Sequence, residues 1–218
     1  VDPGTGALFY LSNATSTFGS VGISSNWNGT KQKQLFSSAI AGWLPQFWRG
    51  SIVLTQTPAD DLPGYAYTLS TTGQLTPLLG PVAGLEVLPD PYQNALLFSA
   101  SAGGSLSLFA QIGTKPPARI ALSTIAEKCV WAPGQSLIVY CAVPNSLPSA
   151  QFLNDWLRGL VHTNDSWWQI DVSSGTATEL YAMPGALDVQ KPTIDPSGNF
   201  IAFVNGADQS LWMLRVNQ

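Results

Sequence analysis

The stretch IDPSGNFIAFV, at residues 194–204, joins a turn-forming segment directly to an apolar strand. The same order of residue types recurs in VDPGTGALFYL at residues 1–11, LPDPYQNALLFSA at residues 88–100 and WAPGQSLIVYCA at residues 131–142. Where the turn has the full order Asp-Pro-x-Gly, Pro fixes φ and Gly supplies a positive φ. The Asp side chain can accept a hydrogen bond from the backbone N–H two residues later. The recurrence predicts a tight turn between the first and second strands of a repeated unit.

The apolar strands that follow these turns are regularly spaced. Four-residue apolar runs begin, in steps of 44, 44, 42 and 63 residues, at Leu8, Ile52, Leu96, Ile138 and Ile201. Turn glycines keep similar steps of 44, 40 and 62 residues, at Gly29, Gly73, Gly113 and Gly175. A period in the range of about 40–45 residues is typical of a four-stranded propeller blade. The long last step predicts an insertion at residues 144–165, with a short helix in AQFLNDWLRG at residues 150–159.

We therefore expect an all-β chain, a β-propeller of four-stranded antiparallel blades with about five blades present. Helical repeats do not fit, because Pro and Gly interrupt the chain every 10–15 residues or so and a 3.6-residue period is absent. The first predicted blade begins at its second strand and the last ends after its third. Since these two gaps do not complement each other, residues 1–218 are predicted to be one propeller that is the C-terminal part of a larger ring, or that another chain completes.

Composition excludes some classes of function. Charged residues make up 10% of the 218 residues, against about 25% in an average soluble domain. The net charge is −4 and no basic run exists, so we expect no nucleic-acid partner. No apolar run approaches the roughly 20 residues that a membrane helix needs. A weakly charged, Ser- and Thr-rich surface favours an extracytoplasmic, secreted or envelope-anchored protein, and Val1 suggests a processed or truncated N-terminus.

Several stretches carry a family resemblance. DPSGNFIAF (195–203) followed by QSLWMLRV (209–216) resembles the TolB-type, WD-like propeller repeat of bacterial envelope proteins. A narrower similarity is to uncharacterised extracytoplasmic propeller proteins of candidate-phylum (Parcubacteria-like) bacteria. It is carried by GSVGISSNWNGTKQKQLFSS (19–38), PGYAYTLSTTGQLTPLLG (63–80), EKCVWAPGQSLIVYCAVP (127–144), WLRGLV (156–161) and the closing LWMLRV (211–216). This resemblance implies a propeller of more blades, held to a membrane only through an anchor outside this chain. It implies no activity.

Cys129 and Cys141 are the only cysteines, and they flank the APGQ turn at residues 132–135. A hairpin centred near residue 135 places them opposite each other, where Cβ atoms come within about 4.5–5.5 Å. One interpretation is a cross-strand disulfide in an oxidising compartment. The other is a pair of buried thiols that act as small apolar side chains.

Catalytic, cofactor and metal residues are not predicted. His162 is the only histidine, its sequence neighbours Asp165 and Ser166 are rarely the partners in a triad, and no G-x-S-x-G motif exists. Two cysteines and one distant histidine do not make a zinc ligand set. Most acidic residues lie in turns, which leaves Asp155 and Asp165 the least explained. Carboxylates that converge in a cleft, or a His162 bonded to one, would favour hydrolysis.

The aromatic residues of the insertion suggest a ligand-binding rim. Trp167 and Trp168 start a predicted strand, so one ring should face each side of the sheet and one of them should be core. The other ring and Trp156, with Asp155 and His162, can form an aromatic surface for a sugar or peptide. The alternative is that the insertion folds back and uses Trp156 and one of the paired tryptophans for packing. The remaining tryptophans are predicted to lie in the blade core, at Trp27, Trp43, Trp48, Trp131 and Trp212.

Three functions follow from these features. The first is a non-catalytic extracytoplasmic scaffold that binds a protein or glycan at its blade loops. The second is a hydrolase that acts on carbohydrate or peptide at the propeller axis. The third is a structural subunit that pairs through open blade edges with the missing part of its ring or with another copy.

Overall fold

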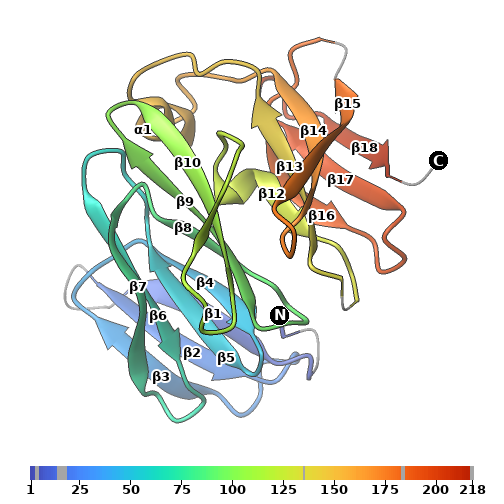
Figure 1. The fold of residues 1–218 in the computed structure, drawn as a ribbon. Helices are drawn as coiled ribbons and strands as arrows, with labels where there is room; N and C mark the ends of the chain where they lie inside the picture. Colours follow the sequence, from blue (N-terminus) through green and yellow to red (C-terminus); the bar gives the residue numbers. More distant parts are fainter. Residues whose placement is uncertain (3–4, 14–18, 135, 183–184, 217–218) are drawn as a thin grey trace.

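The computed structural model describes residues 1–2, 5–13, 19–134, 136–182 and 185–216. Within them the chain forms five antiparallel sheets in sequence order (Figure 1). The first sheet has β1 (Leu8–Asn13), β2 (Ser20–Ser25) and β3 (Lys33–Ser38). The second has β4 (Trp43–Trp48), β5 (Ser51–Gln56), β6 (Pro63–Leu69) and β7 (Leu75–Ala83). The third has β8 (Glu86–Pro89), β9 (Ala95–Ala102), β10 (Ser105–Ile112) and β11 (Ala118–Ile120).

The fourth sheet has β12 (Cys129–Trp131), β13 (Ile138–Pro144), β14 (Asp165–Asp171) and β15 (Thr176–Ala182). The fifth has β16 (Val189–Ile194), β17 (Phe200–Asn205) and β18 (Leu211–Arg215). A 3-10 turn, η1 (Ala126–Lys128), precedes β12, and the helix α1 (Phe152–Leu157) lies between β13 and β14. The predicted all-β class and antiparallel sheets are confirmed, and the apolar runs from Ile52, Leu96, Ile138 and Ile201 each lie in the second strand of a sheet.

Three of the four predicted turns join the first strand of a sheet to its second, between β8 and β9, β12 and β13, and β16 and β17. Between β16 and β17, Asp195 Oδ1 accepts hydrogen bonds from the backbone N–H groups of Asn199 (2.8 Å) and Phe200 (2.7 Å). Gly198 in the same turn has φ +74°, which a residue with a side chain rarely adopts. Between β8 and β9, Asp90 Oδ1 accepts the N–H groups of Tyr92 and Gln93 in the same way.

The core consists of apolar layers between consecutive sheets. Leu96 packs against the second sheet, whereas its neighbour Leu97 packs against the fourth. Val139 and Tyr140 likewise contribute to layers on opposite sides of β13. β5, β9 and β13 are buried on both faces, which agrees with their nearly continuous apolar sequences, whereas burial alternates along β17 of the last sheet.

The core prediction is wrong for two tryptophans. Trp43 and Trp131 are buried and Trp48 is half-buried, but Trp27 is 77% exposed and Trp212 is 43% exposed. Trp27 lies in the turn between β2 and β3, where no sheet covers it. Trp212 lies on β18, which pairs only with β17 within the described residues. Its position at the open edge of the last sheet explains its exposure.

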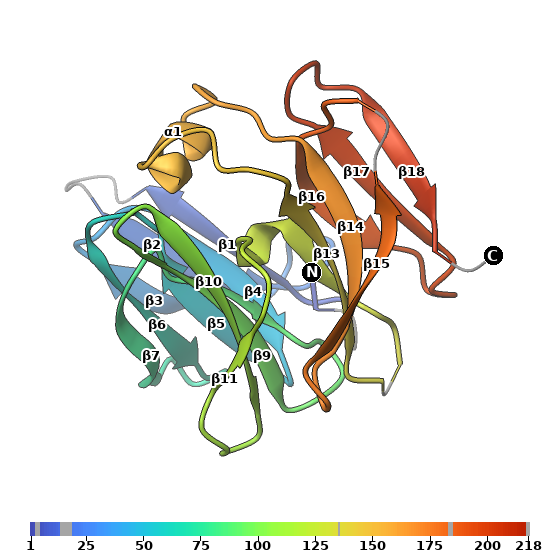
Figure 2. The ribbon, with the colours of Figure 1, turned by 45° about the horizontal axis from the view of Figure 1, so that its top comes forward.

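The predicted insertion lies across one end of the sheets, where α1 is seen in Figure 2. Phe152, Leu153 and Trp156 of α1 form an apolar cluster with Leu106 and Ile125. Asn154 exchanges two hydrogen bonds with Asp60: Asn154 Oδ1 accepts the Asp60 N–H (3.1 Å), and Asp60 Oδ2 accepts the Asn154 N–H (3.0 Å). The segment is therefore anchored to the second and third sheets.

Candidate functional site

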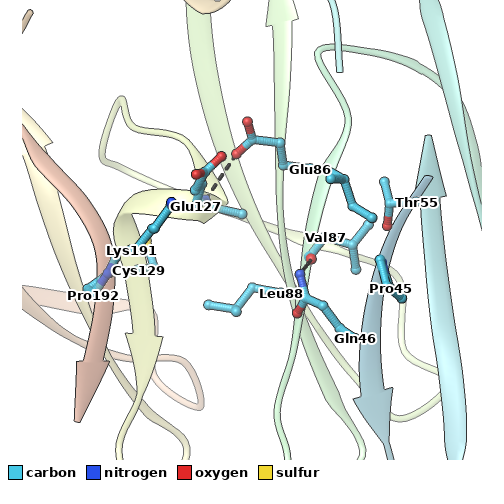
Figure 3. A pocket seen from close by; sticks show the side chains of 12 residues that line it. Pro45, Gln46, Thr55, Glu86, Val87, Leu88, Glu127, Cys129, Lys191 and Pro192 are labelled. Carbon is cyan, nitrogen blue, oxygen red and sulfur yellow. Dashed lines mark hydrogen bonds between the residues drawn. The ribbon is translucent and has the colours of Figure 1, made fainter. Parts of the chain in front are cut away.

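The first strands of neighbouring sheets are bonded to one another by side chains. Gln46 Nε2 on β4 donates to the carbonyl of Val87 on β8 at 2.9 Å. Trp131 Nε1 on β12 donates to the carbonyl of Leu88 at 3.1 Å. These side chains span the spaces between sheets and leave a cavity of about 330 Å³, which we call the central cavity (Figure 3). It is lined by Leu44, Pro45, Gln46, Thr55, Glu86, Val87, Leu88, Ala126, Glu127, Cys129, Lys191 and Pro192.

The central cavity combines an apolar wall with a few polar groups. Its apolar part includes Leu44, Val87 and Leu88, while Figure 3 shows the carboxyl groups of Glu86 and Glu127 close together. Small-molecule sites usually have this composition, because apolar surface provides affinity and a few polar groups fix orientation.

Glu86 is a buried carboxyl group that holds its proton. Its Oε2 accepts the backbone N–H of Glu127 at 3.0 Å, whereas its buried Oε1 has no hydrogen-bond partner. Burial, with a smaller contribution from the Glu127 charge, raises the pKa of Glu86 to about 8. At pH 7 the carboxyl is therefore mostly neutral. Because Oε2 accepts a bond, we place the proton on Oε1.

Glu127 and Lys191 bring opposite charges to the same cavity. Burial raises the pKa of Glu127, and the nearby charges of Lys191 and then Lys128 act in the other direction. Among the described residues, Glu127 and Lys191 form no ion pair with each other or with any other side chain. Both groups are thus open to a ligand.

An irregularity in β16 presents Lys191. The pairing of β16 with β17 shifts register between Gln190 and Thr193. Lys191 has φ +50°, and among the described non-glycine residues with positive φ it alone lies inside a strand. Pro192 has no N–H to give to the ladder. Bulges of this kind redirect side chains and are frequent beside binding sites.

A buried ion cluster lies directly behind this wall. Lys128 is fully buried, and its Nζ donates to Asp165 Oδ2 (2.7 Å) and Asp188 Oδ1 (2.6 Å). It also donates to Thr163 Oγ1 at 2.8 Å and to the carbonyl of Val189 at 3.1 Å. Since all three donor hydrogens and the charge are used inside the protein, Lys128 is a structural cation.

Asp188 is the centre of the cluster. Its Oδ1 also accepts Trp156 Nε1 (2.7 Å) and Thr163 Oγ1 (2.8 Å), and its Oδ2 lies 3.0 Å from His162 Nδ1. Burial acts to raise the pKa of Asp188, but the Lys128 charge and the hydrogen bonds from Lys128, Trp156 and His162 outweigh it and lower the pKa. The carboxylate therefore stays ionised.

Two of the three tryptophans considered for the ligand-binding rim, Trp156 and Trp167, are buried. Trp156 is 3% exposed and bonded to Asp188, and Trp167 is 0% exposed and packs on Phe203. The packing alternative describes both. Trp168 is half-buried on β14, and Asp155 accepts a hydrogen bond from Ser149 at 2.8 Å. His162 is bonded to Asp188, and none of these five residues lines the central cavity.

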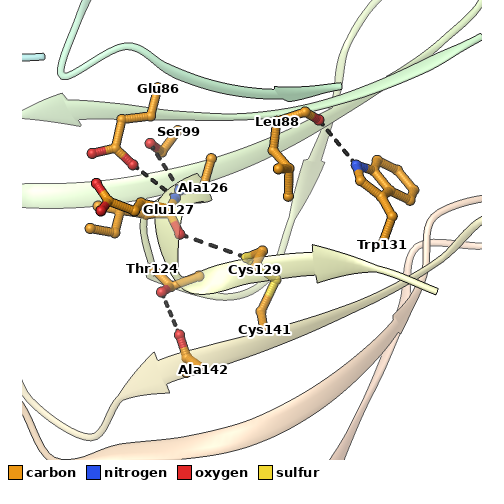
Figure 4. Close-up of a disulfide and its surroundings, with 11 residues drawn as sticks. Glu86, Leu88, Ser99, Thr124, Ala126, Glu127, Cys129, Trp131, Cys141 and Ala142 are labelled. Atoms are coloured by element: carbon orange, nitrogen blue, oxygen red, sulfur yellow. Dashed lines mark hydrogen bonds between the residues drawn. A yellow bond between two sulfur atoms is a disulfide. The ribbon is translucent and has the colours of Figure 1, made fainter. Parts of the chain in front are cut away.

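The two cysteines form a disulfide in the structure (Figure 4). Cys129 on β12 and Cys141 on β13 are directly paired in register, and their Sγ atoms are 2.11 Å apart. Both are buried, and Cys129 also belongs to the cavity wall. The described residues contain no group of three or more His, Cys, Asp or Glu residues that could hold a metal ion.

Sequence reasoning missed the residues that matter most here: Glu86, Glu127, Lys128, Asp188 and Lys191. A signal existed for Glu86, since a charged residue inside the apolar run LEVL is exceptional. No local signal marked Lys128 or Asp188, because their partners lie 35 to 61 residues away for Lys128 and 17 to 60 for Asp188.

Comparison with solved structures defines the class of protein: the chain has a TolB-like propeller fold. It matches TolB from Acinetobacter baumannii at 16% identity with a TM-score of 0.61, over 98% of this chain and 53% of that one. A protein from Agrobacterium tumefaciens described as TolB matches at 16% identity, with a TM-score of 0.55, over 85% and 62%. An oligogalacturonate lyase in complex with manganese matches at 9% identity, with a TM-score of 0.59, over 92% and 55%.

The chain thus spans little more than half the length of these structures. No family model and no curated protein sequence matches it. No helix among the described residues is long and apolar enough to cross a membrane. The narrower resemblance to candidate-phylum proteins stays a prediction.

Proposed function

We propose that this protein is a non-catalytic extracytoplasmic binding module, a scaffold for a protein or glycan ligand that enters the central cavity. The observation that carries the proposal is the cavity itself, with its apolar wall and its unpaired Glu127 and Lys191. The TolB-like neighbours and the weakly charged surface support an extracytoplasmic location. This proposal places the ligand at the first strands of the sheets, and not at the rim residues considered from the sequence.

Protein-observed NMR with a library of small peptides and oligosaccharides tests this proposal. We expect binding to shift the amide signals of Leu44, Glu86 and Leu88, and the indole signal of Trp131, which is bonded to the Leu88 carbonyl. L44W, which places an indole in the cavity mouth, should weaken binding at least about tenfold.

L62W is the matched control, since Leu62 is also exposed but does not line the cavity. Ligand shifts elsewhere on the surface, or equal affinity in L44W and the native protein, would contradict a binding role for this cavity.

A hydrolase acting on carbohydrate or peptide is the second candidate. Two carboxyl groups share the central cavity, one of them protonated at pH 7, and His162 is bonded to Asp188. A neutral carboxyl beside a carboxylate is the arrangement of a general acid and its base. The lyase among the structural neighbours is compatible with catalysis on this fold. If chromogenic glycosides or peptides are cleaved, E86Q should abolish turnover and leave binding intact.

Structural assembly is the third candidate. Within the described residues β1 pairs only with β2, and β18 pairs only with β17, so each sheet has an open edge. Open edges can accept a strand from another copy or from another polypeptide segment. Light scattering of the native protein distinguishes this role by the mass of the particle.

A further inference from the structure

We infer that the central cavity takes a zwitterion, a free amino acid or a short peptide with unblocked ends, whose carboxylate binds Lys191 and whose ammonium binds Glu127. This inference rests on the proposed binding role of the central cavity, but it assigns the cavity a small zwitterion in place of a protein or glycan. It is carried by two opposite charges that line one cavity without pairing with each other.

The charges that face the cavity can be counted one by one. Lys191 contributes a positive charge and Glu127 a negative one. Glu86 contributes none at pH 7, because burial raises its pKa to about 8. Lys128, next to Glu127 in sequence, is bonded to Asp165 and Asp188 and does not line the cavity. The cavity therefore presents one cation and one anion.

Other ligand classes fit this pair less well. A simple anion would pair with Lys191 but be repelled by the Glu127 carboxylate. A simple cation would pair with Glu127 but be repelled by the Lys191 ammonium. A neutral sugar would take both charged groups out of water without providing a counter-charge. A zwitterion pairs both groups at once, which is how a site gains affinity and specificity together.

The surroundings fit a small ligand of this class. At about 330 Å³ the cavity lies near the lower end of ligand pockets, which favours an amino acid or dipeptide over a long chain. Leu44, Val87 and Leu88 offer apolar surface for a side chain. The two charged groups are set by the backbone: Glu127 lies in η1, where its N–H is bonded to Glu86, and Lys191 lies at the bulge of β16.

Calorimetry with one dipeptide in three forms tests the inference. The ligands are alanyl-leucine, its N-acetyl derivative, which lacks the ammonium, and its C-terminal amide, which lacks the carboxylate. We expect the native protein to bind the unblocked dipeptide at least about tenfold more tightly than either blocked form. K191M should bind the dipeptide and its amide equally, and E127Q should bind the dipeptide and its N-acetyl form equally.

K115M is the matched control, since Lys115 is exposed and does not line the cavity, and it should keep the native preference. Unfolding curves of the variants verify that they fold. Equal binding of all three ligand forms to the native protein, or no binding of any, overturns the inference.

The two proposals fail differently. If the dipeptide does not bind but another ligand does, and L44W blocks that ligand, the zwitterion inference is wrong and the binding function stands. If no ligand that binds is affected by L44W, the binding function of the cavity is wrong as well.

Discussion

Replacing Lys128 by methionine should destabilise the protein severely. Methionine keeps most of the apolar stem of the side chain, so the change removes a charge and three donor hydrogens with little loss of volume. Lys128 Nζ holds two buried carboxylates, Asp165 at 2.7 Å and Asp188 at 2.6 Å, and all three side chains are 0% exposed. Removing one partner of a buried ion pair costs about 3–5 kcal/mol, because the remaining charge has neither water nor counter-ion.

Here one cation serves two carboxylates, so we expect the upper part of that range, about 4–5 kcal/mol. Urea unfolding at pH 7, followed by tryptophan fluorescence, measures the difference in free energy of unfolding. K115M removes an exposed lysine and should change stability by less than about 0.5 kcal/mol. A loss of less than about 1 kcal/mol in K128M would refute the view that this cluster holds the sheets together.

The pH dependence gives a second check on the same variant. In the native protein the pKa of Asp188 is lowered, so its ionised form stabilises the fold above the unfolded value of about 4 and this contribution is lost as pH falls through the folded pKa. Without Lys128 the buried Asp188 carboxylate favours protonation instead. The stability gap between K128M and the native protein should therefore be largest near pH 7 and shrink below about pH 4.

Three further perturbations have expected outcomes. The C129A/C141A variant opens a link across 12 residues and should lose about 2–3 kcal/mol, and dithiothreitol should destabilise the native protein but not the variant in urea unfolding. Because the pKa of Glu86 is raised to about 8, native stability should fall as pH rises from about 4.5 to 8, and E86Q should show a flatter profile in thermal melts. D60A removes the carboxylate that accepts the Asn154 N–H, so amide hydrogen exchange should become faster in α1 while the sheets keep their protection. Equally faster exchange in the sheets would show that Asp60 does not stabilise α1 locally.

Most of the fold could be predicted because its determinants are local. Asp195 and Asp90 bond backbone groups two to five residues away, so the sequence around each turn contains the whole interaction. Cys129 and Cys141 are paired across a single hairpin, and the turn between them sets the register. Strand runs buried on both faces are likewise visible as unbroken apolar segments.

The candidate site could not be predicted in the same way, because its contacts join distant parts of the chain. Trp156 looked available for a ligand, but its Nε1 finds Asp188 32 residues away and its ring becomes buried. A lysine is usually exposed, so nothing near Lys128 indicated that it is buried by carboxylates 37 and 60 residues later. The exposure and the role of Trp156 and Lys128 therefore depend on how the sheets pack together, which the local sequence does not reveal.

The same stacking connects stability to recognition. Lys128 directly follows Glu127 in the chain, and Asp188 lies three residues before Lys191. The buried bond from Lys128 to Asp188 therefore joins the two segments that carry the charged residues of the central cavity. This ion pair therefore helps to hold the two segments that carry Glu127 and Lys191, although neither Lys128 nor Asp188 lines the cavity. D188N removes the Lys128–Asp188 ion pair but leaves Asp165 as a partner of Lys128, and urea unfolding shows whether the variant still folds. In folded D188N the affinity for the zwitterion should fall more than that for either blocked dipeptide, because only the zwitterion depends on the separation of both charges.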